Sequence, residues 1–173
     1  MNRRSISIHI AHGSILDVEA DAIVNAANSS GVMGDGVAGA IKRAAGQVVE
    51  DEARRRAPIV VGKAVLTSGG ATKFRGIIHA PTMPQPGIQI PAANVGSATK
   101  GALIEADAHG LESIAVPGMG TGVGGVSHRD AAAMMIGEIK SYSPRSLKSV
   151  ILVDVDEAMV AAWKSELMAR GPF

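Results

Sequence analysis

Short apolar segments alternate with amphipathic segments along most of this chain, and this alternation limits the folds that it can adopt. We expect strands near residues 5–10, 21–24, 64–67, 76–80, 112–117 and 149–155. We expect helices over residues 36–46, 47–57, 93–109 and 127–140, and a last helix that begins at Asp156 or a neighbouring residue. Strands that alternate with helices form sheets that are covered on both faces. The pattern therefore predicts an α/β domain, with an antiparallel edge at the opening strand because no helix separates it from the next strand.

The length and composition fit one domain with an aliphatic core. The chain has 173 residues, of which 46% are hydrophobic but only 2% aromatic. A chain of this length buries most of the apolar surface that it exposes when unfolded. The core must therefore consist of Ile, Val, Leu, Ala and Met. No internal repeat or linker interrupts the pattern, so we expect a single domain over residues 1–173, with the proline-rich loop over residues 81–91 as its one candidate flexible segment.

The charge and the cysteine count exclude several classes of function. The net charge of +1 produces no strong field, so we do not expect nucleic acid as a partner. The absence of cysteine excludes disulfides and thiolate metal sites and fits the reducing cytoplasm, where we expect the protein. The N-terminal MNRRSISIHI alternates instead of forming the apolar region of a signal peptide, and no apolar run approaches a membrane span. The five histidines show no metal-ligand spacing, so we expect neither a metal nor a cofactor.

Two glycine-rich loops each follow an apolar strand and precede a helix. The first reads NAANSSGVMGDGVAG over residues 25–39, and the second reads PGMGTGVGG over residues 117–125. In open α/β sheets, ligands bind at the carboxyl ends of the strands, where helix N-termini present free N–H groups that suit phosphate. Either loop alone is as easily a tight turn. Together, with Asn25 and Asn28 at the end of the first strand, they predict a site for a ligand with more than one phosphate, or with phosphate and sugar.

A dinucleotide fingerprint is the alternative interpretation of the second loop. Gly120, Gly122 and Gly125 match G-x-G-x-x-G between a strand and a helix. The match is weak because a segment this dense in glycine produces it by chance. In addition, no acidic residue follows at a strand end about 20 positions on, as that fold requires.

The two loops together resemble those of macro domains. The resemblance rests on DAIVNAANSSGVMGDGVAGAIKRAAG and SIAVPGMGTGVGG, and the order and spacing of the motifs extend it over nearly the whole chain. It implies a three-layer α/β/α sandwich with a mixed central sheet. Macro domains bind ADP-ribose, and some remove ADP-ribose from proteins or hydrolyse related metabolites such as O-acetyl-ADP-ribose. The resemblance therefore implies ADP-ribose or an ADP-ribosylated protein as the partner.

The resemblance also implies a role for each motif. Asn28 would hydrogen-bond the distal ribose, residues 34–37 would hold a phosphate and the distal ribose, and residues 120–125 would wrap the diphosphate. Residues 13–15 would lie at the adenine, and residues 155–156 would close that side. The expected ligand-binding residues are Ser14, Ile15, Asn25, Asn28, Gly34, Asp35, Gly36, Val37, Ala38, Gly118, Gly120, Thr121, Gly122, Val123, Gly124, Gly125, Val155 and Asp156, and the catalytic candidates among them are Asn28 and Asp35.

Four positions depart from the usual macro-domain pattern. Ser14 stands where the family commonly has an aspartate that accepts from the adenine amino group, and Val155 stands where an aromatic side chain often stacks on adenine. Each loss weakens binding by about 1 kcal/mol or more. Ala38 stands where hydrolase branches often carry an aspartate. Asp35 stands where the first loop of the family usually has a run of glycines, and it either positions a water molecule or points outward, away from the phosphates.

Three functions follow from these observations. The leading one is binding of ADP-ribose or a close derivative. The second is an enzyme, either an ADP-ribosyl hydrolase or an O-acetyl-ADP-ribose deacetylase, which acts at the distal ribose through water held by Asn28 or Asp35; Ala38 counts against it. The third is a base-tolerant module that binds nucleotides or the ends of nucleic acids, because neither Ser14 nor Val155 selects adenine.

Overall fold

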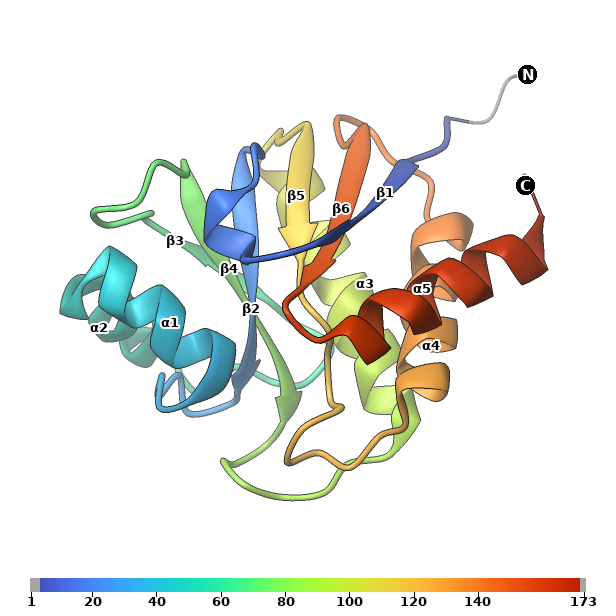
Figure 1. Cartoon of the computed structure of the whole chain (residues 1–173). Helices are drawn as coiled ribbons and strands as arrows, with labels where there is room; N and C mark the ends of the chain where they lie inside the picture. Colours follow the sequence, from blue (N-terminus) through green and yellow to red (C-terminus); the bar gives the residue numbers. More distant parts are fainter. Residues whose placement is uncertain (1–3, 172–173) are drawn as a thin grey trace.

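Six strands form one mixed sheet at the centre of the molecule, which the computed structural model describes over residues 4–171. The strands are β1 (Ser7–His12), β2 (Ala22–Asn28), β3 (Val65–Thr67), β4 (Gly76–Met83), β5 (Ser113–Val116) and β6 (Ser149–Asp154). Their order across the sheet is β1-β6-β5-β2-β4-β3 (Figure 1). Every neighbouring pair is parallel except β3 and β4, which run antiparallel. The mixed sheet expected from the sequence is therefore confirmed.

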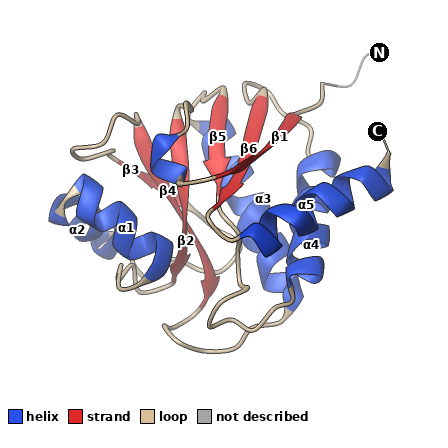
Figure 2. Cartoon of the chain, viewed as in Figure 1, coloured by secondary structure: helices blue, strands red, loops and turns tan. Residues whose placement is uncertain are grey.

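Helices cover both faces of this sheet (Figure 2). They are α1 (Gly36–Ala45), α2 (Gln47–Arg55), α3 (Ala92–Ala108), α4 (His128–Ser141) and α5 (Glu157–Arg170), together with a short 3-10 turn, η1 (Ile15–Asp17). One core joins α3, α4 and α5 to the sheet, and it is aliphatic as expected except for the buried Trp163. A second core joins α1, α2 and η1 to the sheet and contains Phe74. These layers confirm the predicted α/β/α sandwich.

The expectation of an antiparallel edge at the opening strand is wrong. β1 does lie at an edge, but it pairs in parallel with the last strand, β6, so that Ser7 lies opposite Ser149 and His12 opposite Asp154. The antiparallel strand is the short β3 at the other edge. The sequence shows which strands follow one another without a helix. Pairing depends instead on where the chain returns in space, and the partner of β1 is the strand most distant from it in the sequence.

The parallel strands bring their following loops to one edge of the sheet. Because β1, β6, β5, β2 and β4 run in the same direction, their carboxyl ends lie together (Figure 1). The first glycine-rich loop follows β2 and leads into α1, and the second follows β5 and leads into α4. The proline-rich loop follows β4 at the same edge. The fold therefore gathers the segments that the sequence analysis singled out.

The sequence analysis also made predictions about the two chain ends, about membrane-spanning segments and about the arginines of α2. Residues 1–3 and 172–173, the ends of the predicted domain, lie outside the described residues. Between them, no helix combines the length and the apolar character needed to cross a membrane. The arginines at positions 54–56 are exposed at the C-terminal end of α2, where positive charge interacts favourably with the helix dipole.

Candidate functional site

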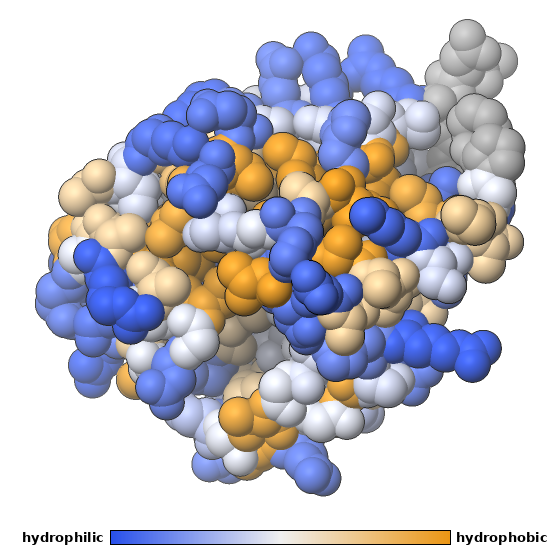
Figure 3. All heavy atoms as spheres, viewed as in Figure 1, coloured by the Kyte–Doolittle hydropathy of each residue, from blue (hydrophilic) through white to orange (hydrophobic). Residues whose placement is uncertain are grey.

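A cavity of about 720 Å³ lies at the carboxyl edge of the sheet, between the two glycine-rich loops. In the space-filling view it is a hollow between the lower loops and the body of the molecule (Figure 3). The predicted binding residues that line it are Ser14, Ile15, Asn28, Gly34, Asp35, Gly36, Val37, Ala38, Gly118, Gly120, Gly122, Val123, Gly124 and Val155. Segments from both halves of the sequence therefore share one cavity.

The first loop ends at the N-terminus of α1, which opens into the cavity. The first backbone bond of this helix runs from the Gly39 N–H to the Asp35 carbonyl, 3.3 Å away. The N–H groups of Gly36, Val37 and Ala38 thus have no partner within the helix, and all three residues line the cavity. Gly36 has a φ of +62°, a conformation that favours glycine. The free N–H groups and the positive end of the helix dipole favour an anion here.

A buried carboxylate holds the first loop against α2. Glu50 accepts a hydrogen bond from the Met33 N–H at 2.6 Å. It also accepts one from the Gln47 amide at 2.8 Å and pairs with Lys42 at 3.0 Å. Burial by itself raises the pKa of this carboxyl, but the bonds from Met33, Gln47 and Lys42 outweigh it and hold the pKa of Glu50 at about 2. Because Met33 directly precedes Gly34 in the cavity wall, Glu50 positions the backbone that leads into α1.

Asn28 shapes the first loop with its own side chain. Its Oδ1 accepts from the backbone N–H of Ser30 at 3.0 Å and also from the Ser30 hydroxyl. Its Nδ2 donates to the Val32 carbonyl at 3.1 Å. Such local turns are typical of asparagine. The amide has two hydrogens, so one is left for a ligand in the cavity that Asn28 lines.

The second loop presents a run of backbone N–H groups. Within residues 4–171, the N–H groups of residues 120–124 donate to no other protein atom. The loop is closed by a bond from the Val126 N–H to the Gly120 carbonyl at 2.9 Å. Glycine is required at position 120, because φ there is +75° and a Cβ would lie 2.7 Å from Cγ2 of Val95. Successive free N–H groups form an anion-binding concavity.

The loop after β4 forms a further wall, which the sequence analysis treated only as a flexible segment. The Ile90 N–H donates to the Gly124 carbonyl at 3.0 Å, so this loop is bonded to the second glycine-rich loop. Cavity residues that the sequence did not point to as ligand contacts are Ala26, Ala27, Val32, Ala40, Thr82, Met83, Pro86, Gly87, Pro117, Val153 and Asp154. Most of these residues lie at or just beyond the carboxyl end of a strand, which is a signal that the sequence already offered, whereas Ala40 lies within α1.

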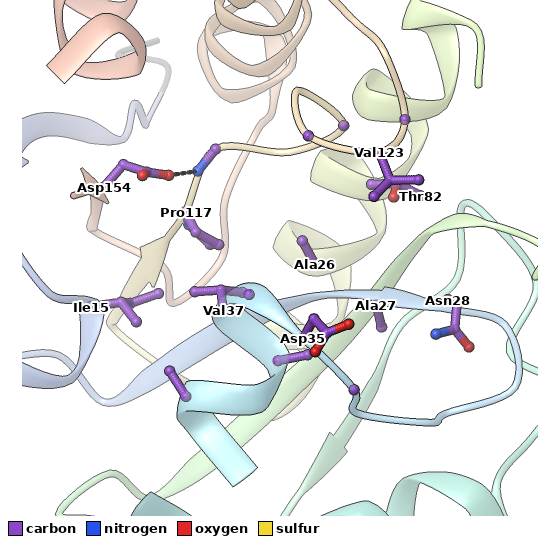
Figure 4. Close-up of a pocket in the computed structure, with 18 of the residues that line it drawn as sticks. Ile15, Ala26, Ala27, Asn28, Asp35, Val37, Thr82, Pro117, Val123 and Asp154 are labelled. Carbon is purple, nitrogen blue, oxygen red and sulfur yellow. Dashed lines mark hydrogen bonds between the residues drawn. The ribbon is translucent and has the colours of Figure 1, made fainter. Parts of the chain in front are cut away.

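The cavity carries negative side chains but no positive ones. Asp35 and Asp154 are the only charged residues among the described residues that line it. Asp35 begins α1 without a side-chain capping bond and is exposed. Figure 4 shows its carboxylate directed into the cavity, on the side of Asn28. An anion bound here is held by backbone N–H groups, while the charge of Asp35 opposes it.

The other end of the cavity combines apolar walls with one carboxylate. Ile15 is buried there. The Oγ of Ser14 accepts from the Leu16 N–H at 3.2 Å and so caps the 3-10 turn η1. Asp154, at the end of β6, accepts from the Gly118 N–H at 2.9 Å through Oδ2 (Figure 4). The two carboxylates of the cavity thus lie in different surroundings, one at α1 and one at β6.

Four predicted binding residues do not line the cavity, namely Asn25, Thr121, Gly125 and Asp156. Asn25 is buried in the sheet, with its Nδ2 3.2 Å from Nδ1 of His79. It lies three residues before Asn28, and successive side chains of a strand point to opposite faces. Asp156 caps α5 by accepting a hydrogen bond from the Ala158 N–H at 3.0 Å. It also pairs at 2.7 Å with His128, whose hydrogen bond lowers the pKa of Asp156.

Within residues 4–171, no three histidine, aspartate or glutamate side chains are grouped to hold a metal ion.

Comparison with known sequences identifies the family. The sequence model of the Macro domain matches residues 24–135, which include both glycine-rich loops. The chain belongs to the macro domain family. An uncharacterized protein of Aquifex aeolicus is 51% identical over 165 residues, covering 95% of this macro domain and 100% of that protein. A second uncharacterized protein, from Aeropyrum pernix, is 48% identical over 139 residues, covering 79% of this chain and 74% of that protein.

Solved macrodomains share the architecture of this chain. The Oceanobacillus iheyensis macrodomain with ADP is 26% identical with a TM-score of 0.84, covering 98% of this chain and 94% of that one. A mutant of the same macrodomain with ADPR is 26% identical with a TM-score of 0.83, covering 98% and 96%. The Trypanosoma brucei macrodomain in complex with ADP-ribose is 26% identical with a TM-score of 0.80, covering 91% of this chain and 68% of that one. The family predicted from the two loops is therefore confirmed.

Proposed function

We propose that this macro domain binds ADP-ribose or a close derivative in the cavity between its two glycine-rich loops. The observation that carries the proposal is a pair of donor sets on the same cavity. One set is the N-terminus of α1, and the other is the run of free N–H groups over residues 120–124. Two such sets suit the two phosphates of an ADP group. The related macrodomains with ADP and with ADP-ribose support the same ligand.

The two ends of the cavity differ as the two ends of ADP-ribose differ. Apolar walls that include Ile15 and Pro117 suit the adenine. The side chain of Asn28 suits the hydroxyl groups of the distal ribose. Because Gly34 and Asp35 are exposed, this second end is open to solvent, as an ADP-ribose group still attached to a protein requires. We therefore propose an ADP-ribosylated protein as the physiological partner, and the absence of cysteine supports the cytoplasm as its location.

Titration calorimetry tests this proposal directly. We expect saturable one-to-one binding of ADP-ribose, and weaker binding of AMP, because AMP offers one phosphate to two donor sets. Circular dichroism on the same sample checks that the protein is folded. A folded protein that shows no binding at about millimolar ADP-ribose, where the binding free energy is only about −4 kcal/mol, contradicts the proposal.

The position of Asp35 favours hydrolysis at the distal ribose as a second function. The exposed carboxylate is directed into the cavity beside Asn28 and is not used as a helix cap. A carboxylate in such a position accepts a proton from water as the water oxygen attacks. In an ADP-ribosyl hydrolase the water oxygen attacks the ribose carbon, the bond from that carbon to the modified side chain breaks, and the released side-chain oxygen takes up the proton. In an O-acetyl-ADP-ribose deacetylase the water oxygen attacks the acetyl carbonyl, the ester bond to the ribose oxygen breaks, the ribose oxygen takes up the proton, and acetate is released. Ala38 supplies no second carboxylate for this step.

Release of ADP-ribose from a protein modified on acidic side chains tests this second function. We expect Asp35→Asn to abolish turnover while binding of ADP-ribose persists. Asn28→Ala should weaken both binding and turnover, because it removes a donor and loosens the first loop. Turnover that is unchanged in both variants shows that these residues do not carry the reaction.

A further inference from the structure

In the function proposed above, the apolar end of the cavity holds a nucleobase whose polar edge needs a partner. Val37 packs against the core cluster that contains Ile15, and Pro117 lies on the same side of the cavity (Figure 4). A ring placed between such side chains loses hydrogen bonds to water. Each polar group on its edge then costs free energy unless the protein pairs it. The partner that the protein offers therefore decides which bases are accepted.

Ser14 is poorly suited to make this choice. Its oxygen already accepts the Leu16 N–H at 3.2 Å and is held at the backbone of η1 as a cap. A hydroxyl also serves as either donor or acceptor. It therefore pairs with an amino group and with a carbonyl oxygen alike, and distinguishes weakly between bases that differ in this way.

Asp154 is the charged side chain at this end of the cavity. It is half-buried at the end of β6, and the Gly13 N–H donates to its backbone carbonyl at 3.0 Å. Asp154 therefore lies directly beside the segment that contains Ser14. Figure 4 shows its carboxylate in the same half of the cavity as Ile15 and Pro117, and away from Asn28.

The carboxylate of Asp154 is held in place and still has acceptor capacity. Oδ2 accepts from the Gly118 N–H at 2.9 Å, and Oδ1 accepts from the Asp156 N–H at 2.9 Å. These two backbone bonds fix the carboxylate without using all of its lone pairs, because each oxygen accepts two bonds. A pre-positioned acceptor of this kind discriminates more strongly than a mobile one.

We propose that Asp154 selects the base of the ligand by accepting a hydrogen bond from an exocyclic amino group. The inference rests on the proposed function, since it requires a base at this end of the cavity. An ionised carboxylate only accepts, so it attracts the amino group of adenine and repels the carbonyl oxygen that hypoxanthine and guanine carry at the same ring position. Asp154 thereby makes the site selective for adenine although Ser14 carries no charge.

Titration calorimetry with ADP and inosine diphosphate tests the inference, because the two ligands differ at that amino or carbonyl group and at the adjoining ring nitrogen N1, which carries a hydrogen only in hypoxanthine. We expect the unaltered protein to bind ADP about tenfold or more tightly than inosine diphosphate, since a bond to a charged acceptor is at stake. In Asp154→Asn, whose amide both donates and accepts, the ratio should fall to within about threefold. Glu157→Gln removes an exposed carboxylate in the first turn of α5, outside the cavity, and should keep the original ratio.

The outcomes separate this inference from the proposed function. Equal binding of ADP and inosine diphosphate by the unaltered protein overturns the inference and leaves the proposed function intact, and this result does not depend on the folding of any variant. A preference that persists in Asp154→Asn also overturns it. If 2′-deoxy-ADP loses affinity while inosine diphosphate does not, the carboxylate serves the ribose instead of the base, and the inference is again overturned. Failure of ADP-ribose itself to bind overturns the proposed function and the inference together.

Discussion

Two carboxylates dominate the electrostatics of the cavity, and they have opposite consequences for a bound nucleotide. Asp154 is fixed by backbone bonds to Gly118 and Asp156 at the end that suits a base. Asp35 stands without a capping bond at the N-terminus of α1, where a phosphate is expected. The same charge therefore favours an amino group at one end and opposes a phosphate at the other.

Replacing Asp35 with asparagine should strengthen the binding of ADP-ribose. Removing one negative charge a few ångströms from a phosphate, in a partly exposed site, gains about 1 kcal/mol, which is about a fivefold lower dissociation constant. The gain should shrink as salt is added, because ions screen exposed charges. Titration calorimetry at low and high salt measures both effects. The control is Asp130→Asn, which removes an exposed carboxylate at the start of α4 outside the cavity and should leave the affinity unchanged. Weaker binding of ADP-ribose by Asp35→Asn would contradict the prediction and mean that Asp35 holds the ligand.

The sequence could show what Ser14 lacks but not what replaces it. The motif around Ser14 is local, so the missing carboxylate was visible without a structure. Asp154 comes from the far end of the chain and meets Ser14 only because β1 and β6 pair, with His12 opposite Asp154. Asn25 illustrates the reverse case, since its place in the NAAN motif suggested a ligand contact, whereas β2 directs it to His79. Strand register decides such placements, and one residue of shift reverses them.

A buried polar cluster connects three strands of the sheet. His79 on β4 lies 3.2 Å from Nδ2 of Asn25 on β2 and 3.0 Å from Oγ1 of Thr67 on β3. All three side chains are buried. Burial lowers the pKa of His79 to about 4, because a charged imidazole would lose its hydration. The neutral form is therefore the one that this part of the sheet accommodates.

Stability should fall as the pH is lowered from about 6.5 to about 4. Over this range the unfolded chain binds a proton at His79, whose ordinary pKa is 6.5, while the folded chain does not. The stabilisation that neutral His79 contributes to the free energy of unfolding is fully present above pH 6.5. It has decreased by about 3 kcal/mol at pH 4, and it changes no further below that pH. Denaturant unfolding at several pH values measures it. His79→Gln should flatten the dependence of the unfolding free energy on pH. The control His9→Gln, on the exposed face of β1, should leave that dependence unchanged. If the unfolding free energy of His79→Gln depends on pH as steeply as that of the unaltered protein, His79 is not the group responsible.

The second glycine-rich loop should tolerate a methyl group at one glycine and not at another. At position 120 an added Cβ meets Val95 at 2.7 Å, and φ is +75°. Gly120→Ala should therefore destabilise the protein by about 1–3 kcal/mol, through strain and overpacking. At Gly122 no atom lies within 4 Å of an added Cβ. Gly122→Ala should therefore change the free energy of unfolding by less than about 0.5 kcal/mol. Thermal unfolding of both variants measures the difference. Equal destabilisation by Gly120→Ala and Gly122→Ala would show that the loop is not packed as described.

The molecule as a whole has a net charge of +1, and neither lysine nor arginine lines the cavity among the described residues. Binding that depends on backbone N–H groups does not release the counterions that lysine and arginine contacts release from nucleic acid. This distinction separates the proposed function from the alternative of a module that binds nucleic-acid ends.

The affinity for ADP-ribose should therefore change little with salt. Between about 50 and 200 mM salt we expect a change of less than about threefold, whereas a protein that neutralises several phosphates of a nucleic acid loses about a thousandfold. Titration calorimetry at the two salt concentrations measures this, with a single-stranded oligonucleotide as the comparison ligand. Tight oligonucleotide binding with a steep salt dependence would favour the nucleic-acid function instead.

The sequence by itself determined the strands and helices, the two glycine-rich loops and the family, because apolar periodicity and the conformational freedom of glycine act over a few neighbouring residues. Only the tertiary structure decided that β1 pairs with β6 and that the loop after β4 is bonded at Ile90 to the second glycine-rich loop. It also decided that Asp154, and not Asp156, lines the cavity. These arrangements arise from contacts between segments distant in the chain, and nothing in the local sequence encodes which distant segments will meet.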